Sequence, residues 1–275
     1  MEIFLYGVIF IFGTIIGSFL NVVIYRLHTG KSLNGRSHCM TCGKTLTWYE
    51  LFPLVSYIFQ GGKCRGCFAH IPSRYLFVEL LTGLSYLTVW NIFAHDIFLL
   101  VVYFILVSVF ILIVLYDIRH TIIPDELTSV VIIVAMVLVG YELMQGNEGI
   151  LSTFAYRIGA GFIASFFFWG LWYISKGRWI GFGDAKLALP LGVIVGIGGI
   201  FSMIVLSFWI GAAVSLFLLG IERLLKGGKT NLHFLSTPLT IKSEVPFAPF
   251  LITGFLLVQF FHADIFNITY ALFFS

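Results

Sequence analysis

Residues 97–116 read IFLLVVYFILVSVFILIVLY, a run of twenty residues without a charged side chain. A helix needs roughly 20 mostly apolar residues to cross the hydrocarbon core of a bilayer. The chain contains seven further runs of this kind, at residues 3–25, 74–94, 125–144, 154–175, 184–198, 200–222 and 246–262. The pattern predicts an all-α polytopic membrane protein with about eight transmembrane helices, the sixth of them short and rich in glycine.

The composition agrees with this prediction. Hydrophobic residues make up 59% of the 275-residue chain, and charged residues make up only 11%. Soluble domains average about half apolar and about a quarter charged residues, so this chain has too little polar surface to cover a globule in water. A soluble two-domain enzyme, a disordered chain, a coiled coil and a collagen are excluded. The net charge of +3 is too small to indicate a nucleic-acid partner.

The basic residues orient the chain in the membrane. Fifteen of the sixteen Lys and Arg residues fall in or beside the first, third, fifth and seventh connections between the apolar runs, and Arg157 is the exception. Cytosolic loops of membrane proteins carry the excess of Lys and Arg. We therefore expect these connections to face the cytosol and both chain termini to lie on the other side of the membrane.

Two pairs of glycines have the spacing of close helix contacts. Gly13 with Gly17 and Gly192 with Gly196 each fit the small-xxx-small pattern, which lets two membrane helices approach closely. Glycine is also simply common in membrane helices, and the sequence leaves both interpretations open.

All four cysteines lie in the first connection, residues 27–73. They form two pairs separated by 21 residues, Cys39-Met-Thr-Cys42 and Cys64-Arg-Gly-Cys67. This spacing is typical of a four-thiolate zinc site, and a reducing cytosol disfavours disulfides. Four thiolates leave no open position on the metal, so we expect a structural, zinc-ribbon-like loop in which Gly43 and Gly66 form the tight turns. An iron–sulfur cluster, a redox pair and a nucleic-acid-binding ribbon are the alternatives.

Two aspartates are the candidate catalytic residues. Asp117 ends the 97–116 run in LYDIRH, and Asp184 opens the sixth run in GFGDAKL. The predicted orientation places both at the cytosolic boundary, where ionisable groups beside long apolar runs are costly and usually functional. Two carboxylates in a low-dielectric site cannot both ionise easily, so one keeps its proton while the other activates a water. Either aspartate alone is equally consistent with a helix end in the headgroup region.

Other polar residues around these runs are candidates for shaping the site. Gly181 and Gly183 flank the second aspartate and are expected to permit tight turns and the approach of a substrate strand. Lys186 follows in the same motif, either as part of the site or as an anchor for the helix end. Asp125 opens the fourth run, where a carboxylate caps a helix and favours its dipole. Glu79, inside the second run, is either a substrate-site carboxylate or a buried hydrogen-bonding partner.

Two further classes of chemistry find little support. The seven histidines are scattered and form no i,i+4 pair, so the sequence does not predict a catalytic metal. A proton-coupled transporter is a rival of a different class, but transporters place their acids near the membrane midplane and often contain inverted repeats. Here the acids lie at the boundary, and no repeat is evident.

At this point the motifs match a known family. The chain resembles the type IV prepilin peptidases in motifs from both halves. In the first half these are GSFLNVVIYRL at residues 17–27, the cysteine loop with Leu46-Thr-Trp48 and Pro53, IPSRY at residues 71–75 and VELLT at residues 78–82. In the second half they are YDIRH followed by IPDELT, then GFGDAKL, and PFAP at residues 246–249. These motifs occur in the family order. His28 and Met40 stand where the family often has proline.

The resemblance implies a bacterial inner-membrane aspartic protease of the GxGD type. Such enzymes remove the basic leader, after a glycine, from the prepilins and pseudopilins of type IV pili and type II secretion, and their two catalytic aspartates fall on Asp117 and Asp184. Members with the four-cysteine loop commonly also methylate the new N-terminus with S-adenosylmethionine. Glu79 or Asn21 could serve that reaction. A general intramembrane GxGD protease acting on other membrane helices is the alternative.

We therefore expect three parts along the chain: a first transmembrane helix at residues 1–26, a cytosolic metal-binding loop at residues 27–73, and a membrane-embedded peptidase core at residues 74–275. The expected partners are prepilin or pseudopilin substrates and the lipid bilayer, with no nucleic acid. A basic leader would need acidic partners, for which Glu50, Glu79 and Asp125 are available.

Overall fold

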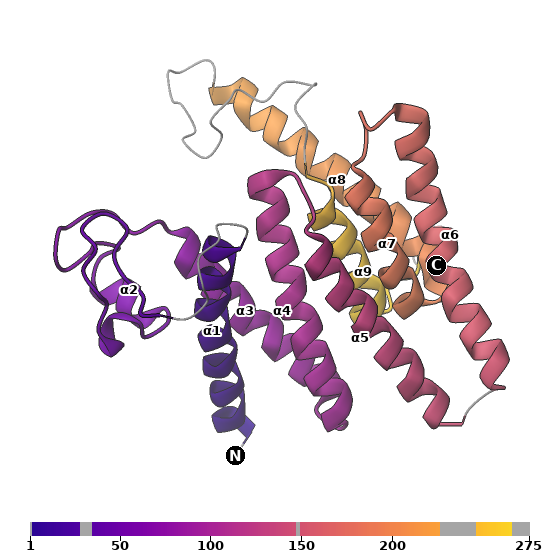
Figure 1. The fold of residues 1–275 in the computed structure, drawn as a ribbon, viewed down its shortest axis with the longest axis horizontal. Helices are drawn as coiled ribbons and strands as arrows, with labels where there is room; N and C mark the ends of the chain where they lie inside the picture. The colour runs from indigo at the N-terminus through magenta and orange to yellow at the C-terminus, as the bar shows by residue number, and fades with distance from the viewer. Residues whose placement is uncertain (1, 28–34, 147–148, 226–245, 266–275) are drawn as a thin grey trace, which may run out of the picture. The chain divides into compact units, whose positions relative to one another are not determined.

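The computed structural model describes residues 2–27, 35–146, 149–225 and 246–265, and no strand forms within them (Figure 1). The helices are α1 (Glu2–Arg26), the short 3-10 helix η1 (Trp48–Glu50), α2 (Val55–Phe59), α3 (Arg74–Phe93), α4 (Ile97–His120), α5 (Asp125–Met144), α6 (Ile150–Ser175), α7 (Phe182–Val195), α8 (Ile197–Leu225) and α9 (Ala248–Phe261). The predicted all-α fold is confirmed. His28 lies outside the described residues, as do four of the fifteen basic residues that orient the chain, namely Lys31, Lys226, Lys229 and Lys242.

Eight apolar helices lie where eight runs were predicted, but they differ in length. Six are long and apolar enough to cross a membrane, namely α1, α3, α4, α5, α6 and α8. Helices α7 and α9 have 14 residues each. At about 1.5 Å per residue they reach about 21 Å, less than the roughly 30 Å of a bilayer core. The short length of α7 agrees with the prediction for the sixth run, whereas α9 is shorter than the predicted run at residues 246–262.

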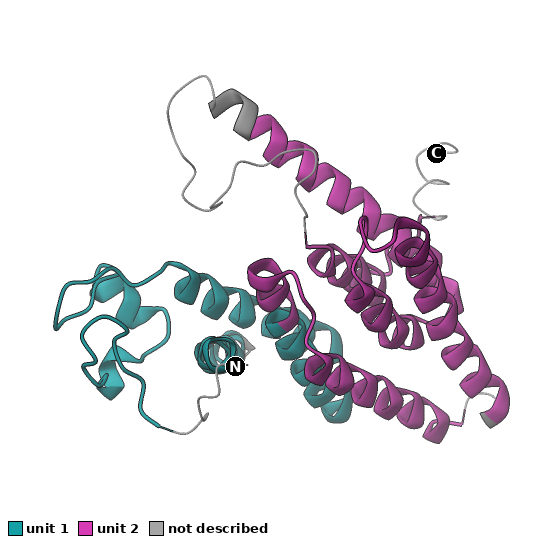
Figure 2. Ribbon diagram, turned by 45° about the horizontal axis from the view of Figure 1, so that its top comes forward, with its two compact units in different colours: residues 1–112 teal, residues 113–275 magenta. Residues whose placement is uncertain are grey.

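The chain divides into two compact units, residues 1–112 and residues 113–275 (Figure 2). The boundary falls inside α4, so Asp117 belongs to unit 2 together with α5 to α9, and all four cysteines belong to unit 1. The three parts expected from the sequence follow membrane topology rather than compactness, and they stay a prediction.

In unit 1, α1 and α3 pack along one another through small residues. A Cβ atom on Gly13 would lie 2.9 Å from the Cα atom of Gly83, and one on Gly17 would lie 2.8 Å from the Cα atom of Glu79. Atoms cannot approach so closely, so any larger residue would push the helices apart. The first glycine pair therefore makes a helix contact, as its spacing predicted.

In unit 2, the short helix α7 lies at the centre and contacts α5, α6, α8 and α9. Nine of its fourteen residues are buried. A Cβ atom on Gly192 would lie 2.9 Å from the carbonyl oxygen of Ala160 in α6, so this glycine also makes a close helix contact. Gly196 has a different function: it ends α7 with a φ of +77°, a conformation that favours glycine.

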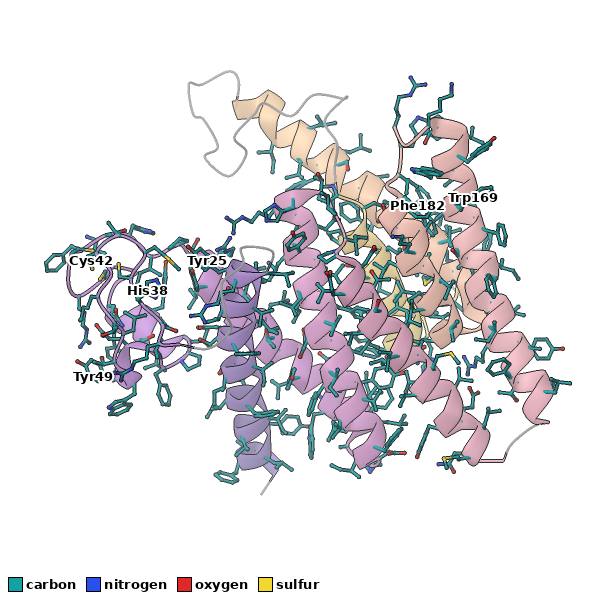
Figure 3. The ribbon with its side chains drawn as sticks, viewed as in Figure 1. Tyr25, His38, Cys42, Tyr49, Trp169 and Phe182 are labelled. Carbon is teal, nitrogen blue, oxygen red and sulfur yellow. The ribbon has the colours of Figure 1, made fainter. Side chains whose placement is uncertain are left out.

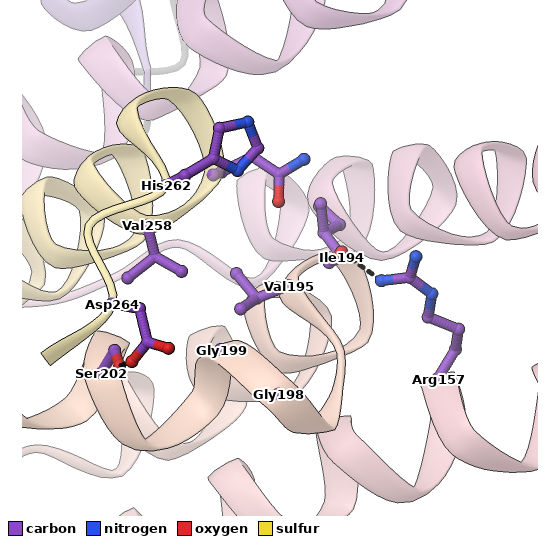
Figure 4. A pocket seen from close by; sticks show the side chains of 10 residues that line it. Arg157, Ile194, Val195, Gly198, Gly199, Ser202, Val258, His262 and Asp264 are labelled. Carbon is purple, nitrogen blue, oxygen red and sulfur yellow. Dashed lines mark hydrogen bonds between the residues drawn. The ribbon is translucent and has the colours of Figure 1, made fainter. Parts of the chain in front are cut away.

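Arg157 is the one basic residue that departs from the charge pattern, and its contacts with the end of α7 explain its position (Figure 4). Its Nη1 group donates to the carbonyl oxygen of Ile194 at 2.8 Å, and so satisfies an acceptor that the helix end leaves open. Its other nitrogens bind the carboxylate of Glu142 at 2.7 and 2.8 Å. The paired charge is neutralised within unit 2, so it carries little weight in the orientation of the chain.

Candidate functional site

Asp117 lies in the last turn of α4 and is held by the beginning of α9. Its side chain is buried, and Oδ2 accepts a hydrogen bond from the backbone N–H of Ala248 at 3.2 Å. Ala248 is the first residue of α9, and Pro249 follows it in the first turn, where proline is favoured. The first N–H groups of a helix have no partner inside the helix and carry partial positive charge, so this helix start favours a carboxylate.

Asp184 occupies the first turn of α7. Its Oδ2 atom accepts the backbone N–H of Gly181, the N-cap residue, at 3.1 Å, which is one half of a capping box. Its other oxygen, Oδ1, is buried and has no hydrogen-bond partner among the described residues. A buried acceptor without a partner costs about 1–3 kcal/mol, so such an atom in a native fold calls for a functional explanation.

The two aspartates come together in unit 2. They are 67 positions apart in the chain, yet they lie close enough for the charge of Asp117 to act on Asp184. Each is held through its Oδ2 atom by a backbone N–H at a helix start. This arrangement fixes both side chains while Oδ1 of Asp184 stays available to another group. A pair of this kind can carry out general acid–base chemistry on a water.

Neither glycine of the GFGD motif adopts a positive φ, but the backbone N–H of Asp184 donates to the carbonyl oxygen of Gly181 at 3.2 Å, which closes a tight turn at the start of α7. Gly181 is extended, with φ −73° and ψ 151°, and donates its N–H to the aspartate. Gly183 packs against the segment after α4: a Cβ atom there would lie 3.1 Å from the Cβ atom of Ile123. The second glycine thus makes room for the chain itself.

Asp125 and Lys186 bind one another at the outer edge of this region. The ammonium of Lys186 lies 2.8 Å from Oδ1 of Asp125, and both side chains are exposed. Asp125 begins α5, as predicted. The pair lies at the rim of a cavity of about 580 Å³ between α5, α6 and α7, which Trp169 and Phe182 also line (Figure 3).

The four cysteines come together in the cysteine loop, the segment of residues 35–73 in unit 1 (Cys42 in Figure 3). Their sulfur atoms all lie within 4.8 Å of one another, and those of Cys39 and Cys67 are 3.8 Å apart. The predicted clustering is confirmed, and the four thiolates could bind a metal ion. Backbone N–H groups of Cys42 and Thr41 lower the pKa of the Cys39 thiol to about 6, which favours the thiolate that a metal requires.

Each cysteine pair is carried by a knuckle of the same design. In the first, Cys39 and Lys44 are joined by a backbone hydrogen bond of 2.9 Å, and in the second Cys64 and Ala69 are joined in the same way. The position four residues after the first cysteine is left-handed in both, with φ of +71° at Gly43 and +58° at Phe68. Gly66 lies within the turn of the second knuckle, as predicted, and the left-handed residue that follows this turn is Phe68.

An ion pair between a buried glutamate and an exposed lysine stabilises the loop beside the first knuckle. The carboxylate of Glu50 is buried and accepts hydrogen bonds from the Lys44 ammonium at 2.9 Å and from the N–H and hydroxyl groups of Thr47. The Thr47 N–H, followed by the Lys44 ammonium, lowers the pKa of Glu50 to about 2. Glu50, a candidate partner for a basic leader, is thus already paired within the loop.

Glu79 lies in unit 1 and the aspartates lie in unit 2. Its buried carboxylate accepts the backbone N–H of Leu54 at 2.8 Å, so it is a hydrogen-bonding partner of the cysteine loop. Leu54 has a φ of +59°, which is unusual for a residue with a branched side chain. Asn21 lies close by on α1 and donates to the carbonyl oxygens of Gly17 and Tyr75 at 3.3 Å each.

Several contributors to these sites escaped sequence reasoning. The N–H groups of Ala248 and Leu54 act through the backbone, which the residue type does not reveal. One signal was available for the former: Pro249 in the PFAP motif marks a helix start, and hence a set of unpaired N–H groups.

Comparisons with known proteins agree with the resemblance drawn from the motifs. Residues 11–93 match the family model described as "Bacterial Peptidase A24 N-terminal domain", and residues 104–216 match the "Type IV leader peptidase family". Among the relatives of this chain are several that carry the name "Prepilin leader peptidase/N-methyltransferase". The relative from Bacillus subtilis is 29% identical, and the matched region covers 93% of this chain and 94% of the relative's length. That of Dichelobacter nodosus is 31% identical, over 66% of this chain and 72% of its own.

The relative from Myxococcus xanthus is 40% identical, but over only 44% of this chain and 36% of its own length. No solved structure matches the chain.

Proposed function

The chain belongs to the type IV leader peptidase family, and we propose on this basis that it is a membrane aspartic endopeptidase that removes the leader peptide from type IV prepilins or pseudopilins. The observation that carries the proposal is the buried carboxylate of Asp184, whose Oδ1 atom has no partner among the described residues and which is near enough to Asp117 for the two charges to interact. The six membrane-length helices support a site in the bacterial inner membrane, and the basic connections support a cytosolic face.

In the proposed mechanism, Asp117 and Asp184 share one proton and hold one water. The ionised carboxylate removes a proton from the water as the water's oxygen attacks the carbonyl carbon of the leader's last residue. The protonated carboxyl then gives its proton to the leaving nitrogen as the C–N bond breaks. Since the two groups titrate as a pair, neither is assigned the part of acid or base. Gly181 and Ala248 keep the carboxylates in place through their N–H groups.

The exposed pair of Asp125 and Lys186 would shape the approach of the substrate. Asp125 and Lys186 both line the cavity between α5, α6 and α7. Lys186 also follows Asp184 by two residues in the chain. The substrate presents an apolar helix whose leader junction lies at the membrane boundary, and this largely apolar cavity suits such a helix.

The metal of the cysteine loop is proposed to be zinc, with a structural function. A tetrahedron with Zn–S distances of about 2.3 Å has S–S edges of about 3.8 Å. The sulfur atoms of Cys39 and Cys67 already stand at 3.8 Å, and all four lie within 4.8 Å, so the four thiolates fit this ion. When bound, zinc would hold the two knuckles together, because four thiolates leave it no position for substrate.

We also propose that the chain methylates the new N-terminus, as the names of its relatives state for them. The methyl donor would be S-adenosylmethionine, which supplies a methyl group on a cationic sulfur that becomes a neutral thioether when the group leaves. The chain's own part is to bind the donor and the amine and to let the amine lose its proton.

The peptidase proposal is tested with purified protein in liposomes and a prepilin as substrate. We expect Asp117→Asn and Asp184→Asn each to abolish the size shift of the substrate while the protein stays folded. Asp96→Asn is the matched control, because Asp96 caps the start of α4 in unit 1 and Asn caps a helix equally well. Processing by either site variant would contradict the assignment.

A second arm separates this proposal from a general intramembrane protease. Replacing the residue before the cut in the substrate should stop cleavage by a leader peptidase that recognises the junction. A protease that recognises only an apolar helix would cleave the altered substrate at the same rate as the original substrate.

A further inference from the structure

The connection between the two knuckles of the cysteine loop carries an exposed apolar surface. Residues 48–59 read WYELFPLVSYIF, and Glu50 is the one charged residue among them. We propose that this segment docks on the cytosolic leaflet of the bilayer and inserts its aromatic side chains at the membrane interface. Six exposed side chains form the proposed surface, which we call the docking face: Trp48, Tyr49, Phe52, Val55, Ile58 and Phe59.

The docking face consists of large apolar side chains that are exposed in the described part of the chain. Trp48 is 78% exposed and Phe59 is 80% exposed. Single exposed apolar residues are common on protein surfaces, but a group of large ones marks an interaction site. The carboxylate of Glu50 is buried and bound to Lys44, so the one charge of the segment does not interrupt this surface.

The opposite side of the segment is fixed to the rest of unit 1. The hydroxyl of Tyr57 donates to the carbonyl oxygen of Ile71 at 3.2 Å. The N–H of Leu54 donates to the carboxylate of Glu79 at 2.8 Å. These contacts hold the segment from one side, so the docking face is the side that remains for another partner.

The hydrogen bond to Glu79 also sets the depth of the segment relative to the membrane helices. Glu79 lies five residues after the first residue of α3, about 7.5 Å along the helix axis. A Cβ atom on Gly17 would lie 2.8 Å from the Cα atom of Glu79, and Gly17 precedes Arg26, the end of α1, by about 13.5 Å. Leu54 therefore lies beside the two spans and not beyond their ends, and α2 lies to the side of α1 in Figure 1. At that level the surroundings of the protein are lipid.

The composition of the docking face is typical of a membrane interface. Trp and Tyr are enriched where headgroups meet the hydrocarbon, because their rings combine an apolar body with a polar group. Trp48 and Tyr49 pack edge to face with their ring centroids 5.8 Å apart, and the guanidinium of Arg65 lies 5.3 Å from the Tyr49 ring. Arg65 is exposed, so it can bind lipid phosphates while the neighbouring rings enter the acyl chains. A cation beside amphipathic rings and wholly apolar side chains favours a bilayer over a protein partner.

The backbone of the segment suits a site with little water. The N–H groups of Leu51, Ser56 and Ile58 donate to carbonyl oxygens three or four residues earlier, at 2.9 to 3.1 Å. Backbone groups that lack partners are costly in lipid, so short helical turns of this kind are suited to insertion at the interface.

The cysteine cluster explains how so short a segment keeps its position. The two knuckles lie immediately before and after it, and their four sulfur atoms lie within 4.8 Å of one another. The cluster thus brings the two ends of the connection together. Figure 3 shows Cys42 and Tyr49 at opposite ends of the loop, so the docking face lies away from the first knuckle. Attachment to the membrane is then a function of the cysteine loop that does not depend on the proposed peptidase or on methyl transfer.

Photo-crosslinking of the full-length, zinc-loaded protein in liposomes tests the docking face. Phe59→p-benzoylphenylalanine places a reactive group in this face, and the liposomes contain phospholipids with an alkyne-tagged acyl chain. The matched control is Met40→p-benzoylphenylalanine, because Met40 is also apolar and 54% exposed but belongs to the first knuckle. We expect at least about tenfold more lipid adduct at position 59 than at position 40.

Trp48 provides a second measurement on the unmodified docking face. Its fluorescence is the difference between the wild type and Trp48→Phe, in liposomes whose lipids carry bromine either near the headgroup or near the chain end. Bromine near the headgroup should quench the Trp48 signal at least about twofold more strongly than bromine near the chain end. Trp209→Phe is the control, because Trp209 lies at the middle of the span Ile197–Ile221 and its signal should show the reverse order.

A charge in the docking face should release it from the membrane. Phe59→Asp should reduce the quenching of Trp48 by at least about half, because a carboxylate is costly in lipid. Thr41→Asp, at an exposed position of the first knuckle, should leave the quenching unchanged, and the zinc content of both variants checks that the loop stays folded. Adducts of position 59 to a second copy of the chain or to an added prepilin, in place of lipid, would overturn the inference. Equal quenching of Trp48 in the wild type and in Phe59→Asp would overturn it as well.

Discussion

The cysteine loop and the aspartate pair are built in opposite ways. The loop uses two short knuckles of one design, each complete within about six residues, and two of its four cysteines are only partly buried. The pair uses single carboxylates that are 67 positions apart, both buried and both held by N–H groups at helix starts. A site of the first kind depends on its metal and its turns, and a site of the second kind depends on the packing of the helices around it.

The two sites lie in different compact units, so we expect that a change that inactivates one site leaves the other active. The loop carries the proposed zinc, and unit 2 carries the proposed peptidase. Damage to the first should affect methyl transfer, and damage to the second should affect cleavage. Four changes test how far this separation holds.

Asp184→Asn should give the largest effect. Cleavage should fall by at least about 10³-fold, which corresponds to about 4 kcal/mol of lost transition-state stabilisation. The melting temperature should stay the same or rise, because the substitution removes a buried charge whose Oδ1 atom has no partner among the described residues. Zinc content and S-adenosylmethionine binding, measured on the same sample, should match the wild type. Loss of either would mean that the two units depend on one another.

Removal of the metal should have the reverse effect. We expect a chelator, or Cys64→Ser, to lower methylation by more than about tenfold, measured as transfer of a labelled methyl group, because the two knuckles come apart without their metal. Cleavage of a prepilin should continue. Metal content by atomic absorption and cleavage by gel shift check the two halves, and restoring zinc to chelated wild type is the control. If cleavage stops too, the loop takes part in peptide hydrolysis.

Gly192→Ala should affect unit 2 through packing alone. Its new Cβ atom would lie 2.9 Å from the carbonyl oxygen of Ala160, and such overpacking costs about 1–3 kcal/mol. The control is Gly159→Ala on α6, where a Cβ atom meets nothing within 4 Å, so the change should be neutral or stabilising by about 0.5–1 kcal/mol. Thermal unfolding of both variants measures the difference. Equal stability would mean that α6 and α7 do not pack as closely as described.

The knuckles should give the smallest effect and the finest comparison between them. Gly43 and Phe68 occupy equivalent left-handed positions, with φ of +71° and +58°. Gly43→Ala should cost about 1 kcal/mol, because a side chain is disfavoured there, and Phe68→Gly should relieve a similar strain. The measurement is zinc affinity against a competing chelator. The same sign of change in both variants would contradict the equivalence of the knuckles.

The positions of the helices and the clustering of the cysteines followed from the sequence, since both rest on patterns within short segments. Apolar runs predicted where all eight long or apolar helices lie, and two Cys-x-x-Cys pairs predicted the cluster. The aspartates were found because acids are rare among apolar runs. In each case the informative property belongs to the residue itself.

What the sequence did not reveal depends on distant partners. Nothing in the run of residues 184–198 says that α7 is buried at the centre of unit 2, because membrane-facing and helix-facing surfaces are both apolar. The sequence also did not reveal that Gly183 makes room for Ile123. The N–H groups that hold the carboxylates belong to backbone positions where any residue type could donate.

The most direct measurement of the central claim compares three variants in one cleavage assay: Asp117→Asn, Asp184→Asn and the double substitution, each at long incubation with excess enzyme. Residues that act as a unit give strongly non-additive effects. We predict that the double variant retains the same residual rate as either single variant. A residual rate in the double variant equal to the product of the two single losses would show that the aspartates act independently and would contradict this account.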